Sequence, residues 1–359
     1  MRILAMEFAG LRNLQSQRLT PGPRGNSFVG PNGAGKTSFL ESIYLLSTGR
    51  SFRASSFEAA IAYGETRSVV SALIESVEGE RRIGVERSRD GSVHARMDGV
   101  DLVNASSLAQ QLPCHLLDAS TIGVVIGSPK ARRQLLDWGV FHVEHDYVAL
   151  TRAFRVALMQ RNAVLQSGDD NQLKFWDRRF VELASRVNVH RQRYVDLLAP
   201  GFQTMLTKLD APSVDIAYRA GWKVDVPLAE VLAASRESER NLGRTAYGPH
   251  RADLRLTSEG RLLPQSLSRG QQKVVAYALV LAQIRLELAA TPHAPIVLVD
   301  DLLAELDAAH ATRVNDALLE LGVQYFVTSI EPNGGATSPG DDLFLKFHVE
   351  QGMITPINL

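Results

Sequence analysis

The first part of the chain alternates apolar and polar positions in short runs, which is the pattern of half-buried β-strands. The runs lie at residues 1–7, 67–75 and 80–87. Asp90-Gly91 and Asp98-Gly99 are turn signals between further short strands. One helix interrupts this pattern, because apolar residues recur at helical spacing between Phe39 and Leu46. Up to about residue 112, the sequence therefore predicts short strands around a single helix.

A helical period replaces the alternation from about residue 129. Apolar residues then recur three and four positions apart, which predicts amphipathic helices. The predicted helices span 129–145, 147–166 and 173–198, with a loop at 167–170. Beyond residue 212 the predicted elements are strands at 214–218, 252–257, 296–299 and 325–327, a helix at 274–290, a loop at 332–340 and a final strand at 343–349. Two β-rich chain ends thus flank a helical block.

Composition narrows the class of protein. Of the 359 residues, 45% are apolar and 22% are charged, which is typical of a globular chain with a sizeable core. Basic and acidic residues both number 39, so any nucleic-acid site has to be a local patch. Cys114 is the one cysteine, which fits a reducing cytoplasm, and we expect it in the core. No apolar run indicates a membrane span or a secretory signal.

A glycine-rich octapeptide matches the phosphate-binding loop pattern G-x-x-x-x-G-K-[ST] at every position. It consists of Gly30, Pro31, Asn32, Gly33, Ala34, Gly35, Lys36 and Thr37. Its glycines free backbone N–H groups to surround phosphate oxygens, Lys36 supplies a charge to the β- and γ-phosphates, and Thr37 can reach Mg²⁺. A strand at 27–29 precedes the loop and a helix follows it. We therefore predict an ATP and Mg²⁺ site at a helix N-terminus.

The apolar strand at 296–299 is followed by two carboxylates, Asp300 and Asp301. In a phosphate-loop enzyme the first acid holds Mg²⁺, and the second can orient the attacking water. A strand end with ordinary acidic turn residues is the alternative interpretation. Together with the phosphate loop, the pair favours an α/β ATPase core that is built from both chain ends and carries an inserted helical domain.

The segment before the predicted helix at 274–290 contains Ser268, Arg269, Gly270 and Gln271. One interpretation is an N-cap, which Ser268 would provide for the following helix. The other is phosphate binding by Ser268, Gly270 and the helix N-terminus. The segment is similar to the LSGGQ-type signature of ABC-type ATPases, with Arg269 where a glycine is usual.

In ABC-type ATPases the signature faces the phosphate loop of a second subunit. The resemblance therefore implies a twofold homodimer that encloses two ATP molecules at its interface. It implies catalytic roles for Lys36, Ser268 and Asp301, and ATP contacts for Gly270 and Gln271. Residues 305–307 resemble the D-loop of this class, and Thr328 stands where many members carry a switch histidine.

Longer markers make the chain similar to the RecF family of bacterial recombination and gap-repair ATPases, which is related to the heads of SMC proteins. The markers lie at 30–37, 48–53, 127–138, 247–251, 268–273 and 300–307. The resemblance implies an ABC-type ATPase head formed by residues 1–112 and 245–359, with a mostly helical inserted domain at 113–244. It also implies that Arg12 approaches the nucleotide phosphates and that Asn32 lies near the γ-phosphate.

By the same resemblance, the chain would be cytoplasmic and nucleoid-associated and would hydrolyse ATP slowly. It would bind duplex DNA and gap junctions in an ATP-dependent manner and assist RecA loading with RecR and RecO. The alternative class is the nucleotide-binding subunit of an ABC transporter, against which the arginine-rich helical insertion and Arg269 argue. A DNA-binding scaffold with a relic ATP site is a further alternative, but Lys36, Thr37, Asp300 and Asp301 are all intact.

Many arginines crowd the helical block, and their role is open from sequence. They are Arg132, Arg133, Arg152, Arg155, Arg161, Arg178, Arg179, Arg186, Arg191 and Arg193. Arginines aimed at phosphates would bind DNA without sequence preference. Arginines on a solvated helix face would instead pair with the acidic residues between them.

Overall fold

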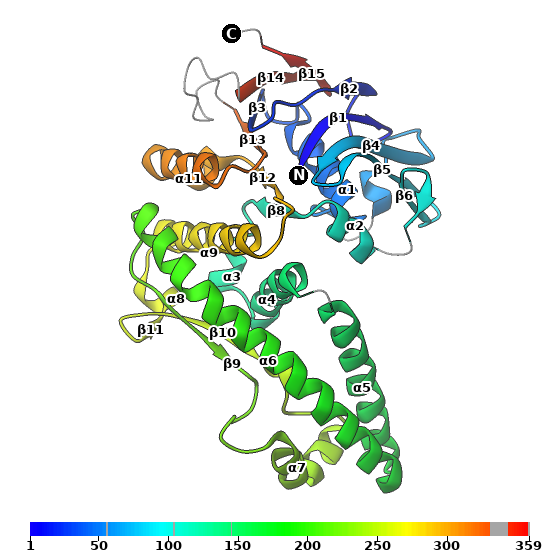
Figure 1. Cartoon of the computed structure of the whole chain (residues 1–359), viewed down its shortest axis with the longest axis vertical. Helices are drawn as coiled ribbons and strands as arrows, with labels where there is room; N and C mark the ends of the chain where they lie inside the picture. The colour runs from blue at the N-terminus through cyan, green and yellow to red at the C-terminus, as the bar shows by residue number, and fades with distance from the viewer. Residues whose placement is uncertain (55–56, 103–104, 145, 331–343, 358–359) are drawn as a thin grey trace. The chain divides into compact units, whose positions relative to one another are not determined.

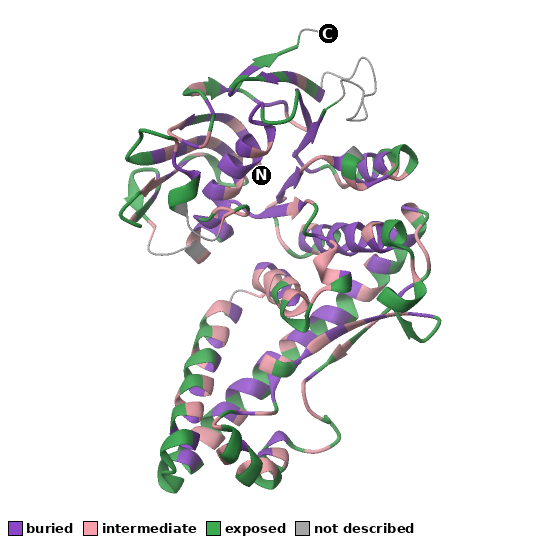
Figure 2. Ribbon diagram, turned by 180° about the vertical axis from the view of Figure 1, so that it is seen from behind, coloured by how far each residue is buried: buried purple, intermediate pink, exposed green. Residues whose placement is uncertain are grey.

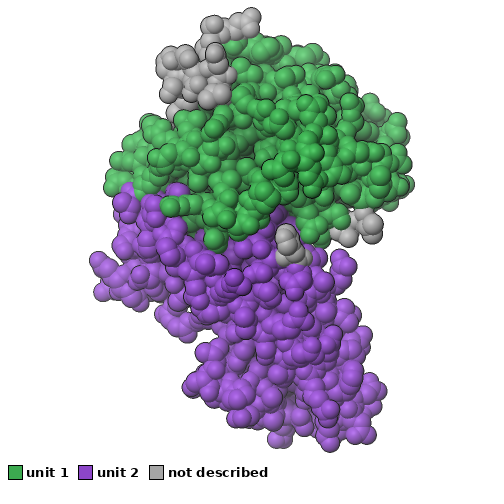
Figure 3. All heavy atoms as spheres, viewed as in Figure 1, with its two compact units in different colours: residues 1–121, 208–210, 277–359 green, residues 122–207, 211–276 purple. Residues whose placement is uncertain are grey.

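The computed structural model describes residues 1–359 except 55–56, 103–104, 145, 331–343 and 358–359, and it divides into two compact units (Figures 1 and 3). Unit 1 contains residues 1–121, 208–210 and 277–359, and unit 2 contains residues 122–207 and 211–276. Unit 1 thus unites both chain ends, and unit 2 contains the helical block. The predicted domain limits after residues 112 and 244 stay a prediction, because compactness alone does not define a domain.

One sheet of unit 1 carries the phosphate loop, and its strand order is β15-β14-β3-β13-β12-β8. The strands are β3 (Gly25–Val29), β8 (Cys114–Leu117), β12 (Ile296–Val299), β13 (Tyr325–Ser329), β14 (Phe344–Glu350) and β15 (Met353–Pro356). All pairs are parallel except β14 with β15. The strand before the phosphate loop and the strand before Asp300 therefore end at the same edge of the sheet, on either side of β13.

The central strands of this sheet are buried on both faces, as is typical of parallel sheets (Figure 2). On one face Phe28, Phe326 and Phe347 pack near Phe39 of α1 (Lys36–Thr48), with the Phe28 and Phe39 ring centroids 4.3 Å apart. Cys114 belongs to the same core and is buried, as expected. Helix α1 is buried nearly all round, so it is a core helix rather than an amphipathic surface helix.

Helices cover the other face of the same sheet. His115 of β8 lies with its Nε2 2.7 Å from Glu287 of α9 (Arg269–Ala290). The Tyr325 hydroxyl of β13 donates to Asn315 of α11 (Ala308–Leu321) over 2.7 Å. These polar pairs are buried, so they satisfy groups that would otherwise be costly inside the core.

The second sheet of unit 1 is antiparallel, with strand order β2-β1-β4-β5-β6-β7. Its strands are β1 (Arg2–Ala9), β2 (Gln17–Leu19), β4 (Arg67–Ser76), β5 (Gly79–Ser88), β6 (Val93–Met97) and β7 (Val100–Asp101). In β4 every second side chain is buried, which is the alternation that the sequence displays. The remaining elements of unit 1 are η1 (Phe57–Ala60), α2 (Ala105–Gln111) and α10 (Leu302–Glu305).

Unit 2 consists of helices and a three-stranded antiparallel sheet of order β11-β10-β9. Its helices are α3 (Gly123–Ile126), α4 (Pro129–Val143), α5 (Tyr147–Ser167), α6 (Asp170–Lys208), α7 (Leu228–Leu242), η2 (Pro249–Arg251) and α8 (Leu263–Ser266). Its strands are β9 (Asp215–Arg219), β10 (Asp253–Ser258) and β11 (Arg261–Leu262). Among the described residues, no helix combines the length and apolarity needed to cross a bilayer.

Some predicted elements differ from the observed ones. Helix α9 begins at Arg269, earlier than predicted, because Ser268 and Gln271 cap it. Helix α6 continues past residue 198 to Lys208, with Pro200 inside it. Helices α7 and α11 and the short α2 were not predicted from the sequence pattern. The loop predicted at 332–340 lies outside the described residues.

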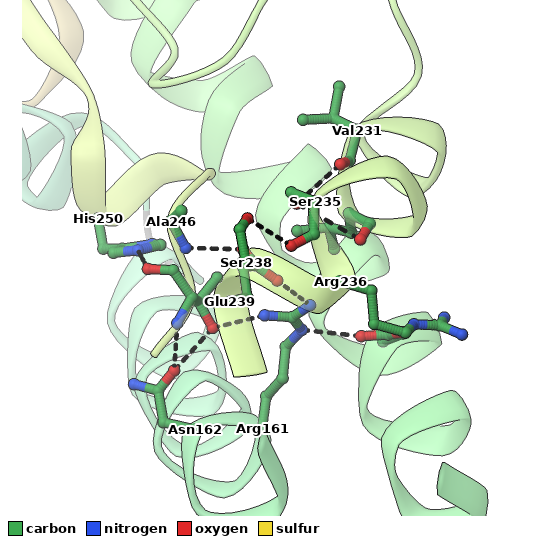
Figure 4. A network of polar contacts seen from close by, with 12 residues as sticks. Arg161, Asn162, Val231, Ser235, Arg236, Ser238, Glu239, Ala246 and His250 are labelled. Carbon is green, nitrogen blue, oxygen red and sulfur yellow. Dashed lines mark hydrogen bonds and ion pairs between the residues drawn. The ribbon is translucent and has the colours of Figure 1, made fainter. Parts of the chain in front are cut away.

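A fully buried arginine joins three segments of unit 2 (Figure 4). Arg161 of α5 donates from Nε to Asp177 of α6 over 2.8 Å and from Nη2 to Glu239 of α7 over 2.7 Å. Its Nη1 donates to the Thr245 hydroxyl over 2.7 Å. The second carboxylate oxygen of Glu239 accepts from the backbone N–H of Ala246. Each buried charge therefore has a partner, which is the condition for tolerating it away from water.

Two further arginines of the helical block form ion pairs within unit 2. Arg191, which is also buried, donates twice to Asp137 over 2.9 and 3.0 Å and once to the Pro249 carbonyl. Arg132 donates twice to Asp253 over 2.7 and 3.1 Å. For these two and Arg161, the structure favours ion pairing over DNA contact. Arg152, Arg155, Arg178, Arg179, Arg186 and Arg193 are exposed.

Replacing the buried arginine should destabilise unit 2. Arg161→Leu removes one of the two arginine partners of Asp177 and leaves the fully buried Glu239 without its ion-pair partner. Removing one partner of a buried ion pair lowers the free energy of unfolding by about 3–5 kcal/mol. We expect a clearly lower urea midpoint in the unfolding transition of unit 2, followed by circular dichroism.

Arg186→Leu is the matched control, because Arg186 is exposed on α6 and lies 3.6 Å from its partner Asp146. Exposed pairs of this kind add little to stability. An Arg161→Leu protein that unfolds at the control's urea concentration would contradict a structural role for the network.

Candidate nucleotide-binding site

The phosphate loop crosses from the end of β3 to the start of α1, as the sequence predicts. Gly33 and Gly35 have φ values of 78° and 118°, a backbone conformation that favours glycine. At Gly30 a Cβ atom would lie 2.1 Å from the Val349 carbonyl oxygen, so no side chain fits there. The loop thus has the tight course that brings backbone N–H groups and the helix N-terminus to one point.

Lys36 is the buried cation of the loop. Its side chain lies folded back, with Nζ donating to the carbonyl oxygens of Gly30 over 2.8 Å and Pro31 over 3.0 Å. Burial lowers the pKa of Lys36, and the carboxylates of Asp301 and Asp300 partly oppose this. An ammonium group that lies near two carboxylates and is shielded from solvent is well placed to bind phosphate.

Asp300 links the phosphate loop to the two neighbouring strands. Its Oδ1 accepts from the Thr37 hydroxyl over 3.0 Å and from the Thr328 hydroxyl over 2.7 Å. The backbone N–H of Asp301 donates in turn to the Thr328 hydroxyl over 2.8 Å. Burial raises the pKa of Asp300, although the two hydroxyls stabilise its ionised form. Thr328 therefore contacts both the Asp300 carboxylate and the Asp301 backbone.

These groups line a cavity of about 390 Å³ in unit 1. Eight predicted residues line it, namely Arg12, Asn32, Gly33, Gly35, Lys36, Thr37, Asp300 and Asp301. Asn13, Ser38, Arg53 and Thr328 complete the lining. Gly30, Pro31 and Ala34 are not among its lining residues, but Lys36 contacts the first two. A cavity of this size suits a small polar ligand.

Arg12 lines the cavity, but its guanidinium group is hydrogen-bonded to other residues of the chain. Its Nε and Nη2 donate to the Glu41 carboxylate over 2.8 and 2.9 Å, and its Nη1 donates to the Ala59 carbonyl oxygen over 2.7 Å. Glu41 is fully buried and also accepts from the Ser51 hydroxyl. The role of Arg12 toward phosphate stays a prediction, and its partner Glu41 was not predicted from the sequence pattern.

Asn13 and Ser38 were missed as site residues. The Asn13 amide donates to the Gly33 carbonyl oxygen over 2.8 Å, and the Ser38 hydroxyl donates to the Asn13 side-chain oxygen over 3.0 Å. This bridge fixes the course of the loop where Gly33 has its unusual conformation. The available signal was the position of Asn13, directly after Arg12 in the N-terminal motif.

The predicted signature residues are not among those that line this cavity. The Ser268 N–H donates to the Gln271 side chain over 2.9 Å, and the Gln271 N–H donates to the Ser268 hydroxyl over 3.3 Å. This reciprocal pair is a capping box at the start of α9, so Ser268 caps the helix, while its role toward phosphate stays a prediction. Ser268, Gly270 and Gln271 are also exposed, and a Cβ atom at Gly270 would meet open space.

Thr37 and Asp300 fit an Mg²⁺ ion that arrives with ATP. Both line the cavity, both offer oxygen atoms, and the two contacting oxygens lie 3.0 Å apart. Burial of the Asp300 carboxylate makes a nearby cation favourable. Within the described parts of the chain, no group of three or more His, Cys, Asp and Glu side chains is arranged to hold a metal ion.

Comparison with known proteins gives a consistent result along the whole chain. The family model described as RecF/RecN/SMC N terminal domain matches residues 2–355. A protein of Stutzerimonas stutzeri (strain A1501), named DNA replication and repair protein RecF, is 39% identical over 363 residues, covering 100% of this chain and 98% of the relative. A protein of the same name from Pseudomonas aeruginosa (strain LESB58) is 37% identical, covering 99% and 98%.

Solved structures show the fold. The recombination mediator protein RecF with ATP, from the RecFOR pathway, matches with a TM-score of 0.87 at 24% identity, covering 99% of this chain and 97% of that one. An SMC head bound to the C-terminal winged-helix domain of ScpA matches with a TM-score of 0.62 at 16% identity, covering 99% and 97%. The predicted α/β ATPase head fold is confirmed. The chain therefore belongs to the RecF family.

Proposed function

We propose that the cavity of unit 1 binds ATP with Mg²⁺ and that the chain hydrolyses ATP slowly. The observation that carries this proposal is the Asp300 carboxylate, which accepts from Thr37 of the phosphate loop and from Thr328 of β13. A carboxylate in contact with a phosphate-loop threonine is the arrangement that binds Mg²⁺ beside the β- and γ-phosphates. The solved relative that matches with a TM-score of 0.87 is named as a complex with ATP.

Different residues of the cavity would bind the phosphates, hold Mg²⁺ and orient the attacking water. The loop N–H groups and Lys36 would bind the phosphates, with the Nζ contacts to Gly30 and Pro31 exchanged for phosphate oxygens. Thr37 and Asp300 would hold Mg²⁺, which neutralises phosphate charge. Asp301 lies beside Asp300 at the cavity and would orient the attacking water.

We infer that ATP joins two copies of the chain. The lining of the cavity contains phosphate-loop and carboxylate residues but none of Ser268, Gly270 and Gln271. Those three residues are exposed, as a surface that completes a neighbour's site has to be. Two such contacts related by a twofold axis would enclose two ATP molecules, and hydrolysis would release the dimer.

The ATP-bound dimer would act on DNA. Arg179, Arg186 and Arg193 of α6 pair with acidic side chains, whereas Arg152 and Arg155 of α5 are exposed and suit sequence-tolerant phosphate binding. The relatives are named DNA replication and repair proteins, and the solved relatives belong to the RecFOR pathway. We propose that this chain binds duplex DNA at gap junctions in the bacterial cytoplasm, near the nucleoid, and assists RecA loading with RecR and RecO.

The transporter alternative is not favoured. A transporter subunit would share the phosphate loop, but the family model and the relatives at 37–39% identity cover essentially the whole chain, including the helical block. A relic ATP site is opposed by the complete set of Lys36, Thr37, Asp300 and Asp301 around one cavity.

Removal of the loop cation should weaken ATP binding and leave the fold intact. Lys36→Ala loses a charge-assisted contact to phosphate, so the dissociation constant for ATP should rise roughly 10- to 100-fold.

The Asp301→Asn variant should bind ATP normally and lose hydrolysis, because the Asp301 carboxylate would act on the attacking water rather than on phosphate. Calorimetry with ATP and Mg²⁺, together with phosphate release, measures both effects.

Lys223→Ala is the matched control, because Lys223 is exposed and belongs to unit 2 rather than to the cavity. Normal ATP affinity in Lys36→Ala would refute the assignment of the cavity. Loss of ATP binding in Asp301→Asn would make Asp301 a binding residue.

Mixing two inactive variants should restore activity if the site is shared between subunits. Lys36→Ala and Ser268→Ala damage different halves of a composite site, so a heterodimer keeps one intact site of two. Random pairing in an equal mixture then predicts about a quarter of the wild-type ATPase rate. The control mixture of Lys36→Ala with Thr37→Ala damages the same half twice and should stay inactive. No recovery at any mixing ratio would exclude the shared site.

A further inference from the structure

A second cavity, of about 450 Å³, lies in unit 2 between α6 and α7. It shares no lining residue with the cavity of unit 1. One part of its wall is apolar, with Val181 from α6 and Ala229 and Leu232 from α7. A volume of this size holds one or two large side chains or a small ligand.

The charged part of the wall has positive groups without partners. Lys174 and Arg178 are four positions apart on α6, so they project from the same side of the helix. Neither has an ion pair or a hydrogen-bond partner within the described residues. Arg236 of α7 donates from Nη2 to Asp177 over 2.9 Å, but its buried Nε lacks an acceptor there. The cavity therefore offers donors and positive charge that unit 2 does not use.

The acidic residues of the wall are already engaged. Asp177 accepts from Arg161 over 2.8 Å and from Arg236 over 2.9 Å. Glu182 accepts from Arg179, one turn earlier on α6, over 2.8 Å. Neither acid compensates Lys174 or Arg178, so the charge left at the cavity is positive.

The wall is also held in place before any partner arrives. Arg161 joins α5 to Asp177 of α6 and to Glu239 of α7, and this network is buried (Figure 4). The two helices that form the cavity are therefore fixed to a common third helix. A preformed cavity loses less conformational entropy when it binds a partner than a flexible one does.

We propose that this cavity docks an acidic peptide segment of a partner protein, with an apolar side chain between carboxylates. The apolar side chain would pack against Val181, Ala229 and Leu232. The flanking carboxylates would accept from Lys174 and Arg178. This partner site goes beyond the proposed ATPase function and does not depend on nucleotide.

The chemistry of the wall favours a peptide over nucleic acid. A DNA backbone presents evenly spaced phosphates and no apolar side chain that would pack against Val181, Ala229 and Leu232. A carboxylate next to an apolar side chain satisfies both halves of the cavity at once. Complementary charges of this kind also raise the association rate and discriminate against other partners.

The test uses the full chain and a fluorescein-labelled pentapeptide with a central leucine and two aspartates on each side. Fluorescence anisotropy measures its binding at low salt. The double variant Lys174→Glu/Arg178→Glu should bind at least about tenfold more weakly, because two charge-assisted contacts become repulsive. Ala229→Trp, which fills the cavity without changing its charge, should weaken binding equally. The same peptide with asparagines in place of aspartates should not bind.

The matched control is Arg152→Glu/Arg155→Glu, which makes the same charge change on exposed positions of α5. It should alter peptide affinity less than about twofold. The proposal fails if this control weakens binding as much as the cavity variant, or if Ala229→Trp has no effect. It also fails if the cavity variants lose affinity for a DNA duplex while wild-type protein ignores the peptide. ATP binding, measured in parallel, should be normal in every variant.

Discussion

The carboxylate of Asp300 is the group on which the candidate site depends. It accepts from Thr37 and Thr328, residues that are 263 and 28 positions away in sequence, and so it brings the phosphate loop and two parallel strands to one point. Burial raises its pKa, which means that ionising this carboxyl group in the folded chain carries a cost. A cation delivered with ATP would relieve that cost.

This arrangement requires the sheet that contains it. Strands β3, β13 and β12 are neighbours and parallel, so their carboxyl ends share an edge, where ligands bind in sheets of this kind. Parallel strands need both faces covered, and α1 on one side and α9 and α11 on the other provide the cover. Since β3 comes from the start of the chain and β12 and β13 from its end, the helical block between them forms a unit of its own. That unit combines many buried apolar side chains, such as Phe154, Phe180 and Phe202, with the buried and ion-paired Arg161 and Arg191.

Local features of the site could be predicted from sequence, and the contacts between distant residues could not. The glycines, Lys36 and Thr37 follow from a spacing that phosphate binding requires, and Asp300 follows from an apolar strand that ends in acids. The bridge from Asn13 to Gly33 and Ser38 and the pairing of Arg12 with Glu41 depend on which segments meet in the fold. The same limit applies to the arginines of the helical block, because the sequence pattern does not indicate that Arg161 is buried and Arg155 is exposed. Helix α9 begins early because its cap is a side-chain pair, which a hydrophobic period does not detect.

The central claim is that ATP completes a site shared by two copies of the chain. Sedimentation velocity of the wild-type chain, with and without ATP and Mg²⁺ and in the presence or absence of a DNA duplex, tests it directly. The account predicts a monomer without nucleotide, and a dimer with ATP and Mg²⁺ that also sediments with DNA. A chain that binds ATP and remains a monomer under all of these conditions would contradict it, because the exposed Ser268, Gly270 and Gln271 would then have no site to complete.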